Sequence, residues 1–147
     1  MALDIHVTVA AVVEREGRFL CVEEEVCGQI VLNQPAGHLE ANESLLQAVV
    51  RETYEETAFV FVPSALLGVY HYTSTSGVAY LRFAFRGEVT EHHPDQPLDT
   101  GIRRALWLSW SELWQRRNEH RGPQVMRALE DYRDGHSYPL ELVTYPL

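Results

Sequence analysis

The sequence predicts an α+β fold, an α/β/α sandwich around a mixed central sheet, and three observations support this. Strand-like apolar segments recur along most of the chain, whereas three other segments have the 3.6-residue spacing of helices. The two kinds of segment follow one another without the regular alternation of a parallel βαβ sheet. At 147 residues the chain fits one domain, residues 1–147.

The first two elements are expected to form a hairpin over residues 5–24. HVTVAAVVE and FLCVEEE have the composition of strands, and Glu-Gly-Arg at 16–18 supplies the turn. The segment QIVLNQPAG is predicted to be short and extended, and Pro35 and Gly37 end it.

A helix is predicted from Asn42 to Thr57. Its apolar stripe falls at positions i, i+3, i+4 and i+7 and comprises Leu46, Val49, Val50 and Thr53. Asn42 is the expected N-cap, and Glu43 suits the positive end of the helix dipole. The strand FVFV follows, and Pro63 is expected to close it.

The second half predicts three more strands and two helices. LLGVYHYT and VAYLRFAFRGEV are strands joined by a turn at 74–77, and 91–101 is a polar loop. RALWLSW is a strand that leads into a short helix, SELWQRR, with Ser111 as its cap. The helix PQVMRALEDYRD stops at Gly135 in the C′ position, and YPLELVTY is expected to be extended.

The composition narrows the function classes. A net charge of −9 argues against binding a nucleic acid polymer, which needs a basic face. Cys21 and Cys27 are expected to be reduced thiols. Neither a signal peptide nor an apolar run of about 18 residues is present, so we expect a cytoplasmic protein away from membranes. An even apolar distribution leaves monomer or homodimer open.

One helix face concentrates acidic residues. At 100° per residue Glu52, Glu55 and Glu56 share a face away from the apolar stripe. Like charges at this spacing repel, and no lysine is interleaved. Oxygen ligands without a nearby Cys or His favour Mg²⁺, or Mn²⁺ in its place, over zinc. For three glutamates alone, a solvated acidic face is the more common explanation.

The wider pattern decides between these readings. Gly37, Glu43, Arg51, Glu52, Glu55 and Glu56 stand as G-x5-E-x7-R-E-x-x-E-E, which resembles the Nudix box. Two positions depart from the box: Thr53 replaces an aliphatic residue, and Ala58 replaces a glycine just past the helix. The resemblance implies a Nudix fold with its catalytic loop-helix-loop at Gly37–Phe59.

The resemblance also implies roles for these residues. Glu52, Glu55 and Glu56 would bind divalent ions, with the Gly37 carbonyl as a further ligand, and Glu52 or Glu55 would orient the attacking water. Glu43 and Arg51 would support these ligands. The implied chemistry is attack of water on a diphosphate phosphorus.

A later loop often supplies another acidic ligand in such enzymes. The candidates that spacing leaves open are Glu88, Asp95, Asp99 and Glu112. His92 and His93 lie in the same region, but two adjacent histidines without further ligands rarely chelate a metal. We expect that pair to be solvated.

Other segments resemble one branch of the family, the NudJ-type phosphatases: HVTVAAVV, FLCVEEE, NQPAGHLE, YLRFAF and YPLEL. This branch implies release of orthophosphate from hydroxymethylpyrimidine diphosphate, thiamine diphosphate and nucleoside di- and triphosphates. Alternatives are a Nudix pyrophosphatase acting on dinucleotides or nucleotide sugars, and a noncatalytic Nudix sensor or scaffold. Sensors typically lose box glutamates, and this chain keeps them all.

Four residues are candidates for contact with a small phosphorylated substrate. Tyr72 and Trp107 offer stacking surfaces, although ordinary packing is the more common explanation for either residue. Arg82 interrupts an apolar strand and would either meet a phosphate or partner a box glutamate. His38 follows Gly37 at the expected mouth of the site, and its role stays open.

Overall fold

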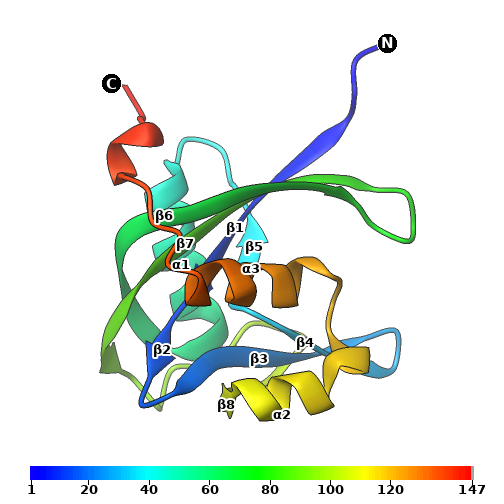
Figure 1. The fold of residues 1–147 in the computed structure, drawn as a ribbon, viewed down its shortest axis with the longest axis vertical. Coiled ribbons are helices and arrows are strands. Elements are labelled where there is room, and N and C mark those ends of the chain that lie inside the picture. The colour runs from blue at the N-terminus through cyan, green and yellow to red at the C-terminus, as the bar shows by residue number, and fades with distance from the viewer. Residues whose placement is uncertain (147) are drawn as a thin grey trace.

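The computed structural model describes residues 1–146, and its strands form two sheets (Figure 1). The first sheet has the order β5-β1-β7-β6. It contains β1 (Ile5–Val12), β5 (Ala36–His38), β6 (Phe59–Thr73) and β7 (Ala79–His92). The second sheet contains β2 (Glu14–Arg15), β3 (Arg18–Val26), β4 (Gln29–Asn33) and β8 (Ile102–Ser109). Within it β3 pairs with β2, β4 and β8.

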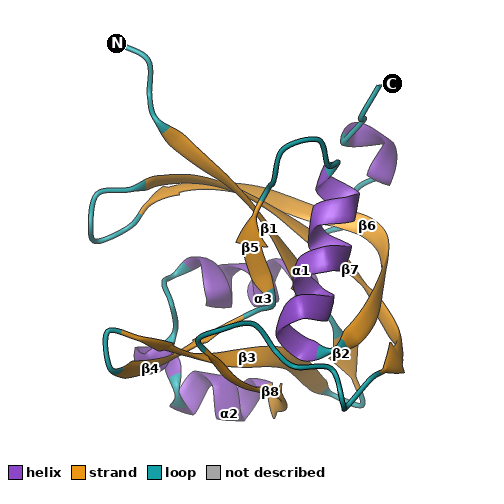
Figure 2. Cartoon of the chain, turned by 180° about the vertical axis from the view of Figure 1, so that it is seen from behind, coloured by secondary structure: helices purple, strands orange, loops and turns teal. Residues whose placement is uncertain are grey.

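Two helices cover opposite faces of the first sheet. Helix α1 (Leu45–Thr57) lies in front of this sheet in Figure 2, and α3 (Gln124–Arg133) lies behind it. Helix α2 (Trp110–Gln115) packs beside β8 in the second layer, followed by the 3₁₀ turns η1 (Arg117–Glu119) and η2 (Leu140–Leu142). This arrangement is the predicted α/β/α sandwich with a mixed sheet. No helix among residues 1–146 has the length and apolarity needed to cross a membrane.

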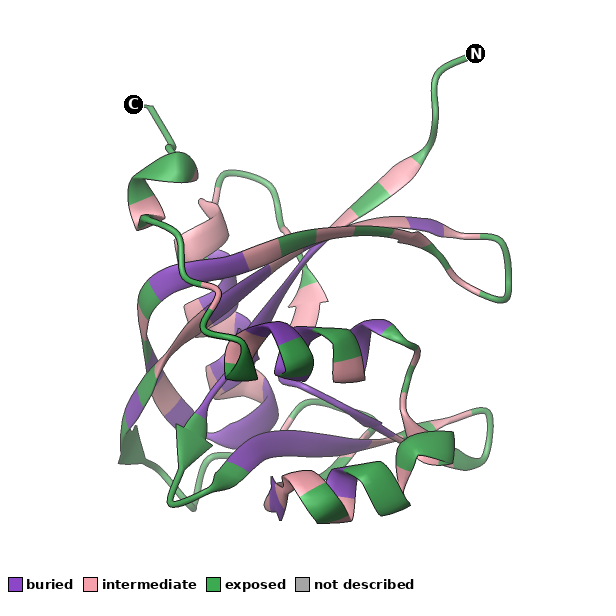
Figure 3. Ribbon diagram, viewed as in Figure 1, coloured by how far each residue is buried: buried purple, intermediate pink, exposed green. Residues whose placement is uncertain are grey.

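Strand β1 separates two apolar cores because its residues point alternately to opposite faces. Val9, Ala11 and Val13 pack toward α1, whereas Ala10 and Val12 pack toward α3. The second part of the strand, from Thr8 to Val12, is buried, whereas Ile5, His6 and Val7 are partly or fully exposed (Figure 3). Burial on both faces explains why its sequence is nearly continuously apolar, as parallel strands covered by helices require.

The predicted hairpin over residues 5–24 is wrong in its partner. Strand β1 pairs in parallel with β7 along its whole length, and antiparallel with β5. Only the two-residue strand β2 forms a hairpin with β3, around Glu16 and Gly17 at φ 52° and 76°. The turn was identified correctly, but the chain changes sheets just before it.

Helix α1 begins two residues later than predicted. Ser44, not Asn42, is the N-cap: its hydroxyl accepts from the Gln47 N–H, and the Gln47 side chain accepts from the Ser44 N–H. Asn42 instead adopts φ 64° in the loop before the helix, a conformation that asparagine tolerates better than most residues. The reciprocal capping box therefore fixes the start of the helix.

Three further boundaries differ from the predictions. Pro63 does not close a strand; it lies within β6, opposite Gly87, where the register shifts. Such irregularities accommodate a residue without an N–H. Helix α2 is capped by Ser109, not Ser111, and the C-terminal segment predicted to be extended forms η2. Gly135 stands just past α3 with φ 85°, as predicted.

Candidate active site

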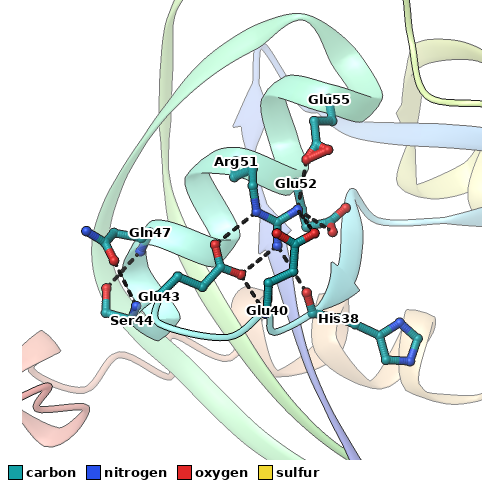
Figure 4. A network of polar contacts seen from close by, with 8 residues as sticks. All are labelled: His38, Glu40, Glu43, Ser44, Gln47, Arg51, Glu52 and Glu55. Atoms are coloured by element: carbon teal, nitrogen blue, oxygen red, sulfur yellow. Dashed lines mark hydrogen bonds and ion pairs between the residues drawn. The ribbon is translucent and has the colours of Figure 1, made fainter.

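Arg51 on α1 is the centre of a carboxylate network (Figure 4). One terminal nitrogen, Nη1, donates to Glu52 Oε1 and to Glu55 Oε1, both at 2.8 Å. Its Nε and Nη2 donate to the two oxygens of Glu43 at 2.9 and 2.6 Å. Arg51 thus contacts both Glu43 and two of the box glutamates.

The same arginine ties the helix to the loop before it. Arg51 Nη2 also donates to the His38 carbonyl at 3.1 Å, and Glu40 lies 3.5 Å from Nη1. Glu43 accepts from the Glu40 N–H at 2.8 Å, so it braces the loop as well as the arginine. The Arg51 hydrogen bonds hold the pKa of Glu43 below its usual range. Glu43 is thus a fixed anion that orients Arg51.

Gly37 is in direct contact with the carboxylate of Glu52. A Cβ on Gly37 would lie 2.1 Å from Glu52 Cδ, which no real structure permits. Glu52 is 9% exposed, and burial raises its pKa although Arg51 opposes the shift. Because Gly37 has no side chain, β5 can lie directly against the carboxylate of Glu52.

Glu56 is the most deeply placed glutamate of α1, at 7% exposed. It accepts from the Ala36 N–H at 2.9 Å, directly before Gly37. Burial, followed by the charges of Glu24, Glu52 and Asp99, raises the pKa of Glu56 to about 9. A carboxylate in this position is strongly destabilised as an anion unless positive charge approaches it.

Among the four candidate late ligands, Asp99 lies by the box glutamates. Its N–H donates to the Glu55 carbonyl at 2.9 Å, and its charge raises the pKa of both Glu52 and Glu56. Burial and the charge of Glu55 raise the pKa of Asp99 itself. The other three lie elsewhere. Glu112 pairs with Arg18, while Glu88 and Asp95 are exposed and none of the shifted box pKa values depends on them.

Sequence reasoning missed Glu24. It lies on β3, far from the box in sequence, yet its charge acts on Glu56. Burial raises its pKa, and Arg121 and Arg82 lower it. The signal was FLCVEEE, three consecutive glutamates on an otherwise apolar strand, of which alternate residues must face the interior.

The donor set fits a hard divalent cation. Glu24, Glu52, Glu55, Glu56 and Asp99 offer only carboxylate oxygens, the ligands that Mg²⁺ prefers. Within residues 1–146 no three Asp, Glu, His or Cys side chains stand close enough to enclose an ion as they are. Glu52 and Glu55 are instead ion-paired with Arg51 (Figure 4).

Arg82 lies beneath this carboxylate cluster on β7. Its side chain is 2% exposed, and Nη2 donates to Asn33 Oδ1 and Gln34 Oε1 at 3.1 and 3.0 Å. It forms no ion pair with a box glutamate among residues 1–146, although its charge is attracted to Glu56. Gln34 in turn donates to the Val125 carbonyl of α3 at 2.8 Å. Arg82 therefore joins the loop before Gly37 to the rest of the molecule.

An aromatic cluster continues from the loop along the first sheet. His38 Nε2 lies 3.1 Å from His6 Nδ1, and both rings approach Tyr80. Tyr80 stacks on Tyr72 with ring centroids 5.4 Å apart. Of the four candidate substrate residues, the structure thus brings His38 and Tyr72 into one cluster.

Trp107 lies apart from that cluster. It packs edge-on against Phe59, 5.7 Å between centroids, within the core beneath α1. The adjacent histidines also diverge: His92 stacks on Phe59, and His93 bonds Tyr54 and Glu91.

Comparison with known proteins agrees with this geometry. The family described as "NUDIX domain" matches residues 4–129. The chain is 41% identical over 138 residues to "Phosphatase NudJ" of Escherichia coli strain K12 and of Shigella flexneri, covering 94% of this chain and 90% of each relative. A solved "NUDIX hydrolase from Nitrosomonas europaea" is 50% identical, with a TM-score of 0.95 over 97% of this chain and 98% of that one.

Proposed function

Because the chain belongs to the Nudix hydrolase family, we propose that it is a Mg²⁺-dependent phosphatase that releases orthophosphate from a small diphosphate or triphosphate. We propose as substrates a thiamine-related pyrimidine diphosphate or a nucleoside di- or triphosphate. Nudix hydrolases generally use divalent metals and act on small phosphorylated molecules. For this chain we specify Mg²⁺ as the metal, orthophosphate as the product and the substrate class just named.

One observation carries the metal proposal: Glu56 is buried among Glu24, Glu52 and Asp99, and within residues 1–146 no arginine is ion-paired to it. A cluster of like charges this deep is unfavourable by itself. A divalent cation between the carboxylates removes the repulsion and admits the negatively charged phosphates of a substrate. The residues we propose as its ligands are Glu52, Glu55, Glu56 and Gly37 through its carbonyl, with Asp99 and Glu24 nearby.

The residues of the site would then have separate roles in hydrolysis. When bound, Mg²⁺ lowers the pKa of water and neutralises charge that develops on the phosphate oxygens. Glu52 or Glu55 would accept the proton of the attacking water, and Arg51 holds both carboxylates within 2.8 Å, which limits their rotamers. Glu43 would keep Arg51 in place. Attack at the terminal phosphorus places the bridging oxygen on the organic product.

The aromatic cluster is the proposed surface for the organic part of the substrate. Tyr72 and Tyr80 are half-buried and already stacked, and His38 joins them beside Gly37. A planar heterocycle gains about 1–3 kcal/mol by stacking on such a ring. The 41% identity to relatives described as phosphatases supports orthophosphate release over hydrolysis of a diphosphate that links two organic groups, as in dinucleotides or nucleotide sugars.

The test is a product assay with purified protein, in the cytoplasm-like conditions of neutral pH and millimolar Mg²⁺. Hydroxymethylpyrimidine diphosphate, thiamine diphosphate, nucleoside triphosphates and dinucleotides are offered in parallel. We expect orthophosphate from the first three classes and none with EDTA in place of Mg²⁺. Release of two nucleotides from dinucleotides alone would favour a pyrophosphatase, and tight binding without turnover a sensor.

A further inference from the structure

The chain has twelve arginines and no lysine. The charges of three of these arginines shift the pKa of carboxylates in the site. Arg51 is saturated by its carboxylates, and Arg82 is 2% exposed. The third is Arg121, whose side chain is 42% exposed. It is thus the arginine of the three that a dissolved anion can reach.

Arg121 is anchored by its backbone. Its N–H donates to the Leu32 carbonyl at 2.8 Å, and the preceding His120 forms a bridge with the same residue. Leu32 belongs to β4, which a short connection joins to β5, the strand that contains Gly37. The arginine is therefore fixed beside the strand that positions the site, although it is 84 residues from Gly37 in the sequence.

The side chain of Arg121 points to the acidic side of the site. Its Nη1 lies 2.7 Å from Oε2 of Glu24, the β3 carboxylate whose charge reaches Glu56. Burial lowers the pKa of His38, and the charge of Arg121 adds to that shift. Arg121 thus pairs directly with one acidic residue of the site, and its charge also acts on the histidine that follows Gly37.

We propose that Arg121 binds the terminal phosphate of the substrate and makes the site selective for diphosphates that end in an uncapped phosphate. This inference rests on the proposed release of orthophosphate. An uncapped terminal phosphate carries nearly two negative charges and three free oxygens, whereas a capped one carries a single charge. A guanidinium binds two phosphate oxygens at once, and its attraction is stronger for the uncapped group because that group carries more negative charge.

The ion pair with Glu24 is compatible with this role. A phosphate offers the same two-oxygen edge as the carboxylate, so Arg121 can exchange one anion for the other, or bind both, without moving its backbone. Arg121 also lies at the surface, where replacing it removes little packing.

The test compares Arg121→Gln with wild type on two substrate kinds in Mg²⁺: a nucleoside triphosphate, which has an uncapped phosphate, and a dinucleoside polyphosphate, which has none. We expect kcat/KM for the uncapped substrate to fall at least tenfold, mostly through KM. We expect kcat/KM for the capped substrate to change less than twofold. Arg121→Lys keeps the charge and should recover part of the loss.

Arg117→Gln is the matched control. Arg117 is exposed four residues earlier, donates to the Trp114 carbonyl and lies over the Trp114 ring, so the same charge change occurs outside the site. Equal losses in both variants, or equal loss on both substrates, would overturn the proposal in favour of a general charge or structural effect.

A second measurement separates this inference from the proposed function. Methylenediphosphonate, which cannot be hydrolysed, is titrated in Mg²⁺ into wild type and Arg121→Gln. At least tenfold weaker binding by the variant supports Arg121 even if wild type proves to release no orthophosphate. Equal binding overturns the role of Arg121 even if orthophosphate release is found.

Discussion

At the scale of single residues, the site depends as much on an absent side chain as on the charged ones. Gly37 has no positive φ, so its backbone conformation alone does not require glycine. Its requirement comes from Glu52, whose carboxylate occupies the space that a Cβ would fill. A conformational explanation for this glycine would therefore predict the wrong consequence of replacing it.

Gly37→Ala should displace the Glu52 carboxylate and weaken Mn²⁺ binding by at least tenfold, with a corresponding loss of hydrolysis. Mn²⁺ binding is measured by electron paramagnetic resonance. Gly28→Ala is the control: nothing lies within 4 Å of its added Cβ, and its φ of 79° costs stability without touching the site. Unchanged Mn²⁺ affinity in Gly37→Ala would refute the proposed contact.

The sequence was informative about the residues of the box and uninformative about their neighbours. Spacing on one helix placed Glu52, Glu55 and Glu56 on one face, and the resemblance to the Nudix box implied that Arg51 supports them. The run of glutamates on β3 indicates an inward-facing carboxylate but not its place at the site, and Arg121 reaches the site through a backbone hydrogen bond that leaves no local pattern. Asp99 could be proposed only as one of four.

At the scale of elements, α1 carries the site, and the residue that caps its C-terminal end departs from the box. Ala58 ends the helix at φ 60°, and its N–H donates to the Tyr54 carbonyl at 2.8 Å. Glycine would avoid the left-handed strain, about 1 kcal/mol. However, Ala58 is 2% exposed, and its buried methyl contributes about 0.8 kcal/mol. The two effects nearly cancel, which explains why alanine is tolerated here.

Ala58→Gly should therefore change the free energy of unfolding by less than about 0.5 kcal/mol, since strain relief of about 1 kcal/mol offsets a lost methyl. Ala48→Gly is the matched control, because Ala48 is 0% exposed inside the same helix. There propensity and burial add, and we expect a loss of roughly 1.5–2 kcal/mol. Urea denaturation measures both; equal effects would refute this account of Ala58.

The elements themselves were easier to predict than their ends and partners. Amphipathic spacing identified α1 and α3 but did not fix where α1 begins. Asn42 was expected as the N-cap, whereas Ser44 and Gln47 each accept a hydrogen bond from the other's backbone N–H and so cap the helix. Pro63 looked like a strand terminator because its missing N–H is normally costly; the register shift opposite Gly87 removes that cost. These outcomes depend on partners that lie across the sheet.

At the scale of the whole molecule, the two layers bring distant acidic residues into one buried cluster. The parallel pairing of β1 with β7 joins residues about half the sequence apart, so no short-range pattern predicts it. That topology positions the loop before Gly37 between the sheets, and the Arg82 hydrogen bonds join this loop to β7 and, through Gln34, to α3.

The buried cluster predicts a specific dependence on pH. Glu56 has its folded pKa raised to about 9, so the protonated form is favoured on folding. Its contribution to stability is fully present below the unfolded pKa near 4.5 and is lost as pH rises through about 9. In metal-free protein the thermal midpoint should thus fall over this range, and less so in Glu56→Gln.

Metal binding should release protons for the same reason. At pH 7 Glu56 is protonated, and a cation must displace that proton, so Mg²⁺ binding should release about one proton. Calorimetric titrations in two buffers of different ionisation enthalpy measure this number. Release that is unchanged in Glu56→Gln would show that another group supplies the proton.

The central claim, that the Glu56 cluster holds the catalytic cation, is tested most directly by orthophosphate release from Glu56→Gln in Mg²⁺. Glutamine keeps the shape and can accept from the Ala36 N–H, but it carries no charge. We predict that turnover falls by orders of magnitude while the thermal midpoint of the metal-free protein stays the same or rises. Full activity in a folded Glu56→Gln protein would contradict the account.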